Sequence, residues 1–171
     1  VVDDSRIRRR PDGTVAEITS EFINTGSVKT DGLDIALAHS IDSSKFFDAV
    51  NLNFAATYIN EFEVQTNSSS AAFDGAGSRN FKNQFRSMPK IRGNLSVTFE
   101  KGAHTLSTQL RYIDDYENDQ SNTTIDSLVT LDGQYSTNLY KDTTRVSVGI
   151  KNIMDEDPPS LGANVRPGYD N

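Results

Sequence analysis

The sequence contains no cysteine, only two histidines and no apolar run as long as the ~18 residues that a transmembrane helix needs. The missing cysteines exclude disulfide bonds and thiolate metal sites. The missing apolar run excludes a membrane-spanning helix. Positive charge is also in short supply, since 17 Lys and Arg face 24 Asp and Glu, for a formal net charge of −7. This balance argues against a nucleic-acid partner, because such a partner requires a basic patch.

The 171 residues suffice for one ordinary domain with a core, although only 35% of them are hydrophobic. The first residues, Val1 to Asp4, provide neither a basic start nor an apolar stretch, so no secretory signal is visible. The sequence therefore predicts a chain that is soluble, already processed, or cut from a larger protein.

The hydrophobic residues recur with a period of two, and no sustained 3.6-residue stripe is present. Successive side chains of a strand point to opposite faces, so each such segment predicts a β-strand with one apolar and one polar face. In one strand Leu95 and Val97 alternate with Asn94 and Ser96. The alternating segments are residues 33–41, 52–64, 91–99, 105–112, 129–139 and 146–150, with a less regular one at 14–24 after the turn residues Pro11-Asp12-Gly13.

The connections between these segments fall into two classes. Short ones lie near residues 42–46, 100–103 and 138–143, and long ones cover residues 66–87, 114–124 and 154 to the end. Short and long alternate along the chain, apart from a shortish reversal expected at 25–31. In an up-and-down antiparallel sheet, this alternation places the tight turns at one end and the long loops at the other.

Strands of about ten residues with such turns are typical of an outer-membrane β-barrel, whereas soluble sandwiches usually have strands of about five or six. The polar face is rich in Asn, Ser, Thr and Gln, which suits a lumen. Aromatic residues near the strand ends suit membrane girdles, although aromatics favour strands in general. The sequence predicts an all-β fold, an antiparallel up-and-down transmembrane β-barrel, of which about seven or eight strands are present. The girdle residues are Phe99 and Tyr140 at the short turns and Tyr58, Phe62 and Tyr112 at the long loops.

In this arrangement the apolar face points outward. Leu95, Val97 and Leu110 are then predicted to face lipid. The predicted lumen-lining residues are Arg92, Asn94, Gln109 and Arg111, together with Ser96. A soluble β-sandwich that binds carbohydrate is the alternative fold, in which two apolar faces bury each other.

Two stretches resemble the barrels of TonB-dependent outer-membrane receptors. In NTGSVKTDGLDIALAHSI (24–41), Asn24, Gly26 and the triplet Gly32-Leu33-Asp34 open a long strand as in that family. In VGIKNIMDEDPPSLGANVRPGYDN (148–171), Lys151 to Asp155, the pair Pro158-Pro159 and the run Gly168-Tyr169-Asp170 follow the family's order. Proline cannot continue a ladder, so Pro158-Pro159 is expected to end the strand.

The resemblance covers essentially the whole chain. It implies that residues 1–171 are the C-terminal portion of a receptor barrel domain, without the plug, the TonB-contacting segment or the closing strand, since family barrels close with about 22 strands. The implied function is active uptake of a scarce substrate (a siderophore, cobalamin, oligosaccharide or similar) across the outer membrane of a Gram-negative bacterium. The implied partners are outer-membrane lipid, the plug of the same full-length chain, the TonB complex and the substrate. A passive porin is an alternative.

Residues for catalysis are scarce, and we expect neither an enzyme nor a cofactor. His39 and His104 lie in predicted strands among apolar neighbours, where packing is the ordinary role. No nucleophile motif surrounds any serine. The acidic residues Asp114, Asp115, Glu117 and Asp119 lack the spacing of a calcium loop, so we predict a solvated loop and no metal site.

The long loop 65–87 is the candidate for substrate contact, because aromatic and Arg side chains suit a sugar or an anionic chelate. The alternative is that its phenylalanines pack the loop onto the barrel rim. Its candidate residues are Phe73, Arg79, Asn80, Phe81 and Phe85. The lumen-lining residues named above are candidates for hydrogen bonds to the plug.

Overall fold

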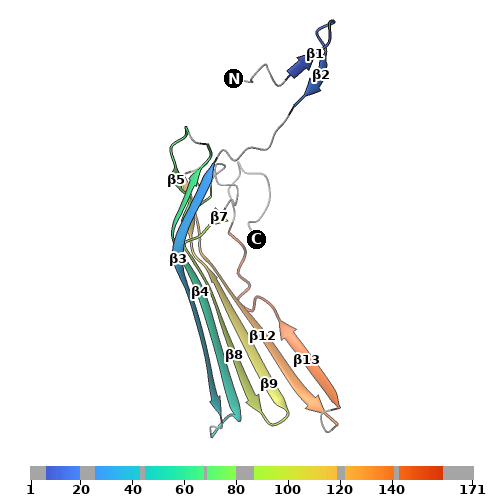
Figure 1. The fold of residues 1–171 in the computed structure, drawn as a ribbon. Coiled ribbons are helices and arrows are strands. Elements are labelled where there is room, and N and C mark those ends of the chain that lie inside the picture. Colours follow the sequence, from blue (N-terminus) through green and yellow to red (C-terminus); the bar gives the residue numbers. More distant parts are fainter. Residues whose placement is uncertain are drawn as a thin grey trace.

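The computed structural model describes residues 7–19, 26–42, 45–67, 69–79, 87–118, 122–140 and 143–159. Six long β-strands dominate these residues (Figure 1). They are β3 (Ser27–Asp42), β4 (Ala49–Gln65), β8 (Ile91–Lys101), β9 (His104–Ile113), β12 (Leu128–Leu139) and β13 (Thr144–Ile150). Within the described ranges, no helix is long and apolar enough to cross a membrane.

The long strands form an antiparallel meander, in which each long strand pairs with the next. The order in the sheet is β13-β12-β9-β8-β4-β3, and the short strand β5 (Phe73–Asp74) pairs with β4 as the seventh. Short connections at one end join β3 to β4, β8 to β9 and β12 to β13. The all-β, antiparallel, up-and-down prediction is confirmed, and so are the three short connections.

The strand register places most apolar side chains of the long strands opposite other apolar side chains. Leu95 of β8 lies between Phe54 of β4 and Leu110 of β9, while Ser96 pairs with Gln109. Directly paired residues share a face of a sheet, so one face is apolar and the other polar. The exposed apolar residues on the first face are Leu33, Ile35, Leu37, Ile41, Tyr58, Ile91, Leu106, Tyr135, Leu139, Val146, Val148 and Ile150.

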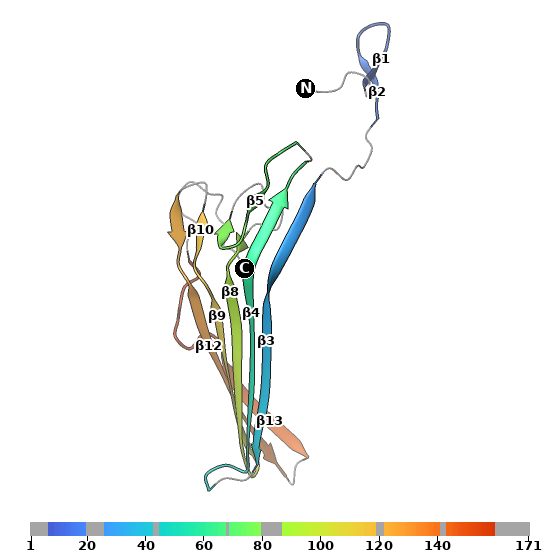
Figure 2. The same cartoon turned by 60° about the vertical axis from the view of Figure 1, so that its left-hand side comes forward.

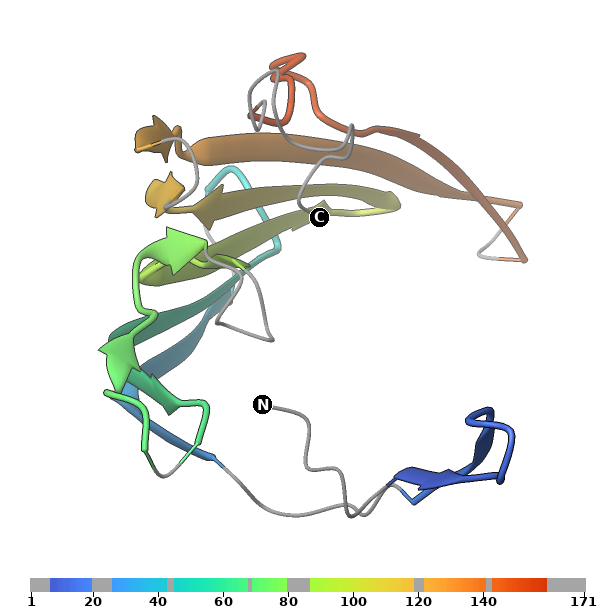
Figure 3. The same cartoon turned by 90° about the horizontal axis from the view of Figure 1, so that it is seen from above.

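The sheet is curved, and its apolar face is the convex one. Residues 151–159 run along the convex side of β12 (Figure 3). Ile153 in this segment brings its Cδ1 atom to 3.0 Å from the position that a Cβ atom on Gly133 would take. Gly133 pairs with Ile150, so it belongs to the apolar face. The polar face therefore lines the concave side, as the inside of a barrel wall does.

The described strands form an open arc and not a closed barrel. Among the described residues, β3 pairs only with β4, and β13 pairs only with β12. Figure 3 shows these two strands at opposite ends of the arc. The expected strand at 14–24 is found in part, as β2 (Val15–Ile18), which pairs with β1 (Ile7–Arg9) in a separate hairpin. Residues 20–25 lie outside the described part of the chain.

A β-bulge interrupts the pairing of β3 with β4. Gly32 pairs with Ile59, but the preceding residue of β3, Asp31, pairs with Glu61. Asn60 is therefore the extra residue of β4. One extra residue shifts the alternation of side chains by one, so every residue of β4 beyond Asn60 points to the face opposite to that expected.

The sequence predicted that Phe62 and Val64 continue the apolar face of Leu52 and Tyr58. This prediction is wrong. Phe62 pairs with Thr30, which lies on the polar side of β3. Both side chains thus point to the concave side, where each is only 6% exposed. Phe62 does not belong to an outward-facing aromatic girdle, because the bulge, which hydropathy alone does not reveal, turns it inward.

The reversal expected at 25–31 is also wrong for the described residues from Ser27 onward. β3 begins at Ser27 and continues without interruption to Asp42. Lys29 and Asp31 lie within this strand although they interrupt its hydrophobic alternation. In the structure they pair across the sheet with Glu63 and Glu61.

Short strands occupy the end of the sheet with the long connections. These are β6 (Ser78–Arg79), β7 (Ser87–Met88), β10 (Tyr116–Asn118) and β11 (Thr123–Ile125), which form a separate four-stranded sheet in the order β11-β10-β6-β7. We call this the rim sheet. The long connections 66–87 and 114–124 were predicted as loops, and both contain short strands of two or three residues. Strands this short show no hydrophobic period.

Candidate lumen face and rim

Polar side chains on the concave face pair with one another across the strands. The hydroxyl of Thr57 donates to Asp34 at 2.6 Å, and that of Ser40 donates to Asn51 at 2.8 Å. Such pairs satisfy polar groups locally and leave a wall of small hydrogen-bonding side chains. Two further hydroxyl pairs on this face are Thr98 with Ser107 at 3.2 Å and Ser136 with Ser147 at 2.9 Å.

Arg111 is held by two partners on the neighbouring strand β12. Its Nη2 donates to Asp132 Oδ2 at 2.7 Å, and its Nε donates to Thr130 Oγ1 at 3.3 Å. The side chain of Arg111 remains 44% exposed. The guanidinium is thus oriented by the wall and still accessible from the concave side, so it can donate hydrogen bonds to an anionic or polar group there.

The other predicted lumen-lining residues share this face. Asn94 pairs directly with Arg111, and Gln109 pairs with Ser96. Arg92 lies two residues before Asn94 on β8, and its Nη2 donates to the backbone oxygen of Ser87 at 3.4 Å. The structure therefore brings Asn94, Gln109 and Arg111 side by side, while Arg92 reaches toward the rim strand β7.

Asn152 ends β13 and fixes the turn that follows. It has φ of 51°, and its backbone N–H donates to Asp132 Oδ1 at 2.9 Å. Its side-chain amide donates to the oxygen of Glu156 at 2.9 Å and accepts from the N–H of Glu156 at 3.2 Å. β13 therefore ends at Ile150. The expectation that Pro158-Pro159 ends the strand is wrong, because Asn152 turns the chain earlier.

Two of the five loop candidates lie among the described residues. Phe73 of β5 pairs with Val64 and shares its concave-side face. Arg79 belongs to β6, where it pairs with Ser87 of β7 and, in parallel, with Asn118 of β10. Phe73 and Arg79 thus belong to different sheets and are not paired. The remaining candidates, Asn80, Phe81 and Phe85, lie outside the described residues.

The rim sheet has a small buried centre that the sequence did not suggest. Tyr116 pairs with Ile125, which is 2% exposed, and Asn118 is fully buried. Tyr116 and Asn118 are buried on one face of β10, and Glu117 between them is exposed. A strand of three residues is too short for such an alternation to be recognised in the sequence. Of the acidic residues predicted to form a solvated loop, Asp114 and Asp115 directly precede this sheet and Glu117 lies within β10, while Asp119 is outside the described residues.

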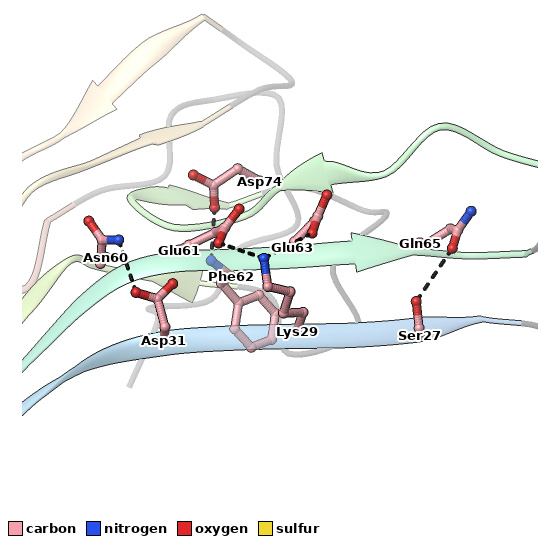
Figure 4. A network of polar contacts seen from close by, with 9 residues as sticks. All are labelled: Ser27, Lys29, Asp31, Asn60, Glu61, Phe62, Glu63, Gln65 and Asp74. Atoms are coloured by element: carbon pink, nitrogen blue, oxygen red, sulfur yellow. Dashed lines mark hydrogen bonds and ion pairs between the residues drawn. The ribbon is translucent and has the colours of Figure 1, made fainter.

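A charged strip lies on the convex side of β3 and β4 beyond the bulge, and the sequence did not suggest it either (Figure 4). Lys29 Nζ lies 3.2 Å from Glu61 Oε2 and 3.9 Å from Glu63 Oε2. Asn60 Nδ2 donates to Asp31 Oδ2 at 3.0 Å. We define the charged strip as Ser27, Lys29, Asp31, Glu61, Glu63 and Gln65, which occupy one face by register.

The histidines lie on the apolar face. His39 pairs with Leu52, and the Nδ1 atom of His104 lies 2.6 Å from the Tyr135 hydroxyl. In the described residues, no group of three or more His, Asp or Glu side chains is arranged to hold a metal ion.

A curved antiparallel sheet with an apolar convex face and a polar concave face is the arrangement expected of a membrane β-barrel wall. A family model for the β-barrel of TonB-dependent receptor-like proteins matches residues 4–153. The chain belongs to this family of outer-membrane receptors and transporters. Neither a curated protein nor a solved structure gives a significant match.

Proposed function

We propose that residues 1–171 are the C-terminal portion of the barrel of an active-transport receptor in the outer membrane of a Gram-negative bacterium. The receptor takes up a scarce substrate such as a siderophore, cobalamin or an oligosaccharide. The TonB complex supplies the energy, through a plug domain elsewhere in the same full-length protein. Family membership supports this reading.

The observation that carries the proposal is the distribution of exposed apolar residues. Leu37 is 60% exposed and Val148 is 64% exposed, and both lie on the convex face. A soluble sandwich would bury such a face against a second sheet. Here the described residues provide no second sheet of that size, since the rim sheet has four strands of two or three residues. Lipid is the environment that suits a wide, exposed apolar face.

Two groups of residues have proposed roles. Arg111, Asn94, Gln109 and Arg92 line the lumen and hydrogen-bond the plug. Phe73 and Arg79 of the long loop 65–87, together with Asn80, Phe81 and Phe85, contact substrate at the long-loop end, which faces outward from the cell. The pairing of Phe73 with Val64 also supports the alternative in which this phenylalanine packs the loop onto the rim.

Uptake measurements test the transport role. A strain that lacks the full-length gene is compared with the parent for growth on limiting ferric siderophores, cobalamin and oligosaccharides, and both backgrounds are repeated without TonB. We expect loss of one substrate in the gene deletion and the same loss without TonB. If uptake required the gene but not TonB, the proposed active-transport receptor would be rejected in favour of a passive porin.

A further inference from the structure

Three strands of the long sheet, β8, β9 and β12, end at nearly the same register level, whereas β13 ends before it, where Ile150 pairs with Gly133. Tyr58 of β4 pairs with Ile91, the first residue of β8. Ile113, the last residue of β9, pairs with Leu128, the first residue of β12. Ile113 also pairs with Arg92, so all these ends lie within one residue of the level of Tyr58. Among the six long strands, only β3 and β4 continue beyond this level. Short rim strands such as β10 lie near the upper parts of these two strands (Figure 2).

The bulge lies immediately beyond that register level. Ile59, directly after Tyr58, is the last residue of β4 before the extra residue Asn60. On the convex face of β3, Leu33 is the last apolar residue, and Asp31 and Lys29 follow it. Two independent features, the strand ends and the change from apolar to charged side chains, therefore coincide with the bulge.

The apolar band below the bulge has the height of a membrane core. From Val50 to Tyr58 the chain advances eight residues, or about 27 Å at about 3.4 Å per residue. With a strand tilt of about 40°, the band is about 21 Å tall, close to the ~25 Å apolar band of outer-membrane barrels. The charged strip thus begins where the hydrocarbon should end.

The charged strip is unsuited to hydrocarbon. Lys29 opposes three carboxylates, those of Asp31, Glu61 and Glu63, so the strip carries a formal charge of −2. Charges in a bilayer core are expensive, and their side chains need water or polar headgroups. The bulge places all of them on the convex side, while Phe62 and Val64 fill the concave side behind them.

We propose that the bulge at Gly32 and Asn60 marks the outer boundary of the hydrocarbon layer, and that the charged strip contacts the hydrated headgroup layer of the outer leaflet. The strip continues the convex face that meets lipid, so the same membrane covers both. This inference rests on the proposed function, because it requires the convex face to lie against a bilayer.

Spin labels on the full-length receptor in liposomes test the boundary. The chain has no cysteine of its own, so Leu37→Cys, Leu33→Cys and Glu63→Cys each add one labelling site here. Accessibility to oxygen, which partitions into lipid, is compared with accessibility to a water-soluble nickel chelate. We expect oxygen to dominate at positions 37 and 33, and the nickel chelate to dominate at position 63.

The outcomes separate the two proposals. Nickel-dominated accessibility at position 37 would overturn the membrane reading itself. Two results would overturn only the proposed boundary, provided that accessibility to oxygen dominates at position 37. One is that oxygen accessibility also dominates at position 63, and the other is that accessibility to the nickel chelate dominates at position 33.

Deletion of Asn60 tests the role of the bulge. Without the extra residue, Glu61 and Glu63 must turn to the concave side, or the register of β3 and β4 must slip. We expect a large loss of folded receptor in the outer membrane, measured by its heat-modifiable gel mobility. Deletion of the exposed Ala71, in the connection between β4 and β5, is the matched control. Equal yields for the two deletions would contradict a boundary role for the bulge.

Discussion

The two ends of β4 place their apolar side chains on opposite faces of the sheet, although they belong to one strand. From Val50 to Tyr58, apolar side chains point to the convex face and small polar ones to the concave face. From Glu61 to Gln65, the charged side chains are convex and the apolar ones concave. Hydrophobic alternation looks similar in both parts, so the pattern alone does not tell which side meets water.

The difference reflects what surrounds each part. The lower part, Val50 to Tyr58, lies in the region of the sheet whose convex face we assign to lipid. The protein itself buries little of this face, as Leu37 on the neighbouring strand β3 is 60% exposed. The upper part is covered on its concave side, where Phe62 is 6% exposed. A bulge between them allows a single strand to serve a membrane wall and a water-exposed rim.

The largest effect is expected when residues 1–171 are expressed alone, without the rest of the barrel. β3 and β13 each lack a second partner in the described sheet, and the convex apolar face would be left in water. Unpaired edges and exposed apolar surface promote association. We expect aggregation or a requirement for detergent, with little cooperative unfolding. A monodisperse, detergent-free protein with a sharp thermal transition would instead favour the soluble sandwich.

Two substitutions that place a charge on opposite faces of β8 compare the convex and concave sides of the sheet directly. Leu95→Arg places a guanidinium on the convex face between Phe54 and Leu110. At the midplane of the bilayer this costs about 2–4 kcal/mol, so we expect much less folded receptor in outer-membrane fractions. Ser96→Arg, one residue along the same strand, faces the concave side and should be tolerated. Equal tolerance of both variants would count against the membrane reading.

The bulge itself depends on the absence of a side chain at Gly32. A Cβ atom there would overlap the backbone oxygen of Tyr58. We expect Gly32→Ala to destabilise the full-length receptor by about 1–3 kcal/mol, as overpacking typically does, in denaturant unfolding from detergent. Gly93→Ala is the control, because its Cβ would lie an ordinary 3.6 Å from the oxygen of Ala55. A small, equal effect for both variants would show that the bulge tolerates a side chain.

The sequence predicted the wall better than the rim, for physical reasons. A period of two over ten residues is a strong signal, so the shared face of Leu95 and Leu110 and the three short connections were predictable. A bulge shifts the phase by one residue without changing composition, so the inward turn of Phe62 was missed. The rim sheet was missed because its strands have two or three residues.

The candidate site was predictable in part. Strand alternation correctly grouped Asn94, Gln109 and Arg111 on one face. Asp132, which holds Arg111 and the turn at Asn152, was not singled out, because alternation within a strand does not reveal which residues of β9 and β12 lie opposite each other. Lumen and substrate roles remain predictions.

The smallest expected effect concerns the end with the short turns. Asp48, in the connection between β3 and β4, accepts a hydrogen bond from Lys101 Nζ at 2.9 Å and another from the backbone N–H of Gly102 at 2.6 Å. The Lys101 ammonium and then this N–H hold the pKa of the Asp48 carboxyl below its ordinary value. Asp48 thus ties its own turn to the turn between β8 and β9.

A depressed carboxyl pKa means that the folded protein favours the ionised form, so this contribution to stability is present at neutral pH. It is lost as the pH falls below the ordinary carboxyl value, near 3.8, and through the lower folded value. Asp48→Asn should therefore lower the thermal midpoint of the detergent-solubilised receptor slightly at pH 7, and the difference from the unmodified protein should shrink as the pH falls below 3.8. Asp12→Asn, in the exposed turn between β1 and β2, provides a matched control, because Thr14 likewise lowers the pKa of that carboxyl but the turn joins no strands of the long sheet. If Asp48→Asn changed the midpoint no more than Asp12→Asn at pH 7, the tie between the two short turns would contribute nothing to the wall.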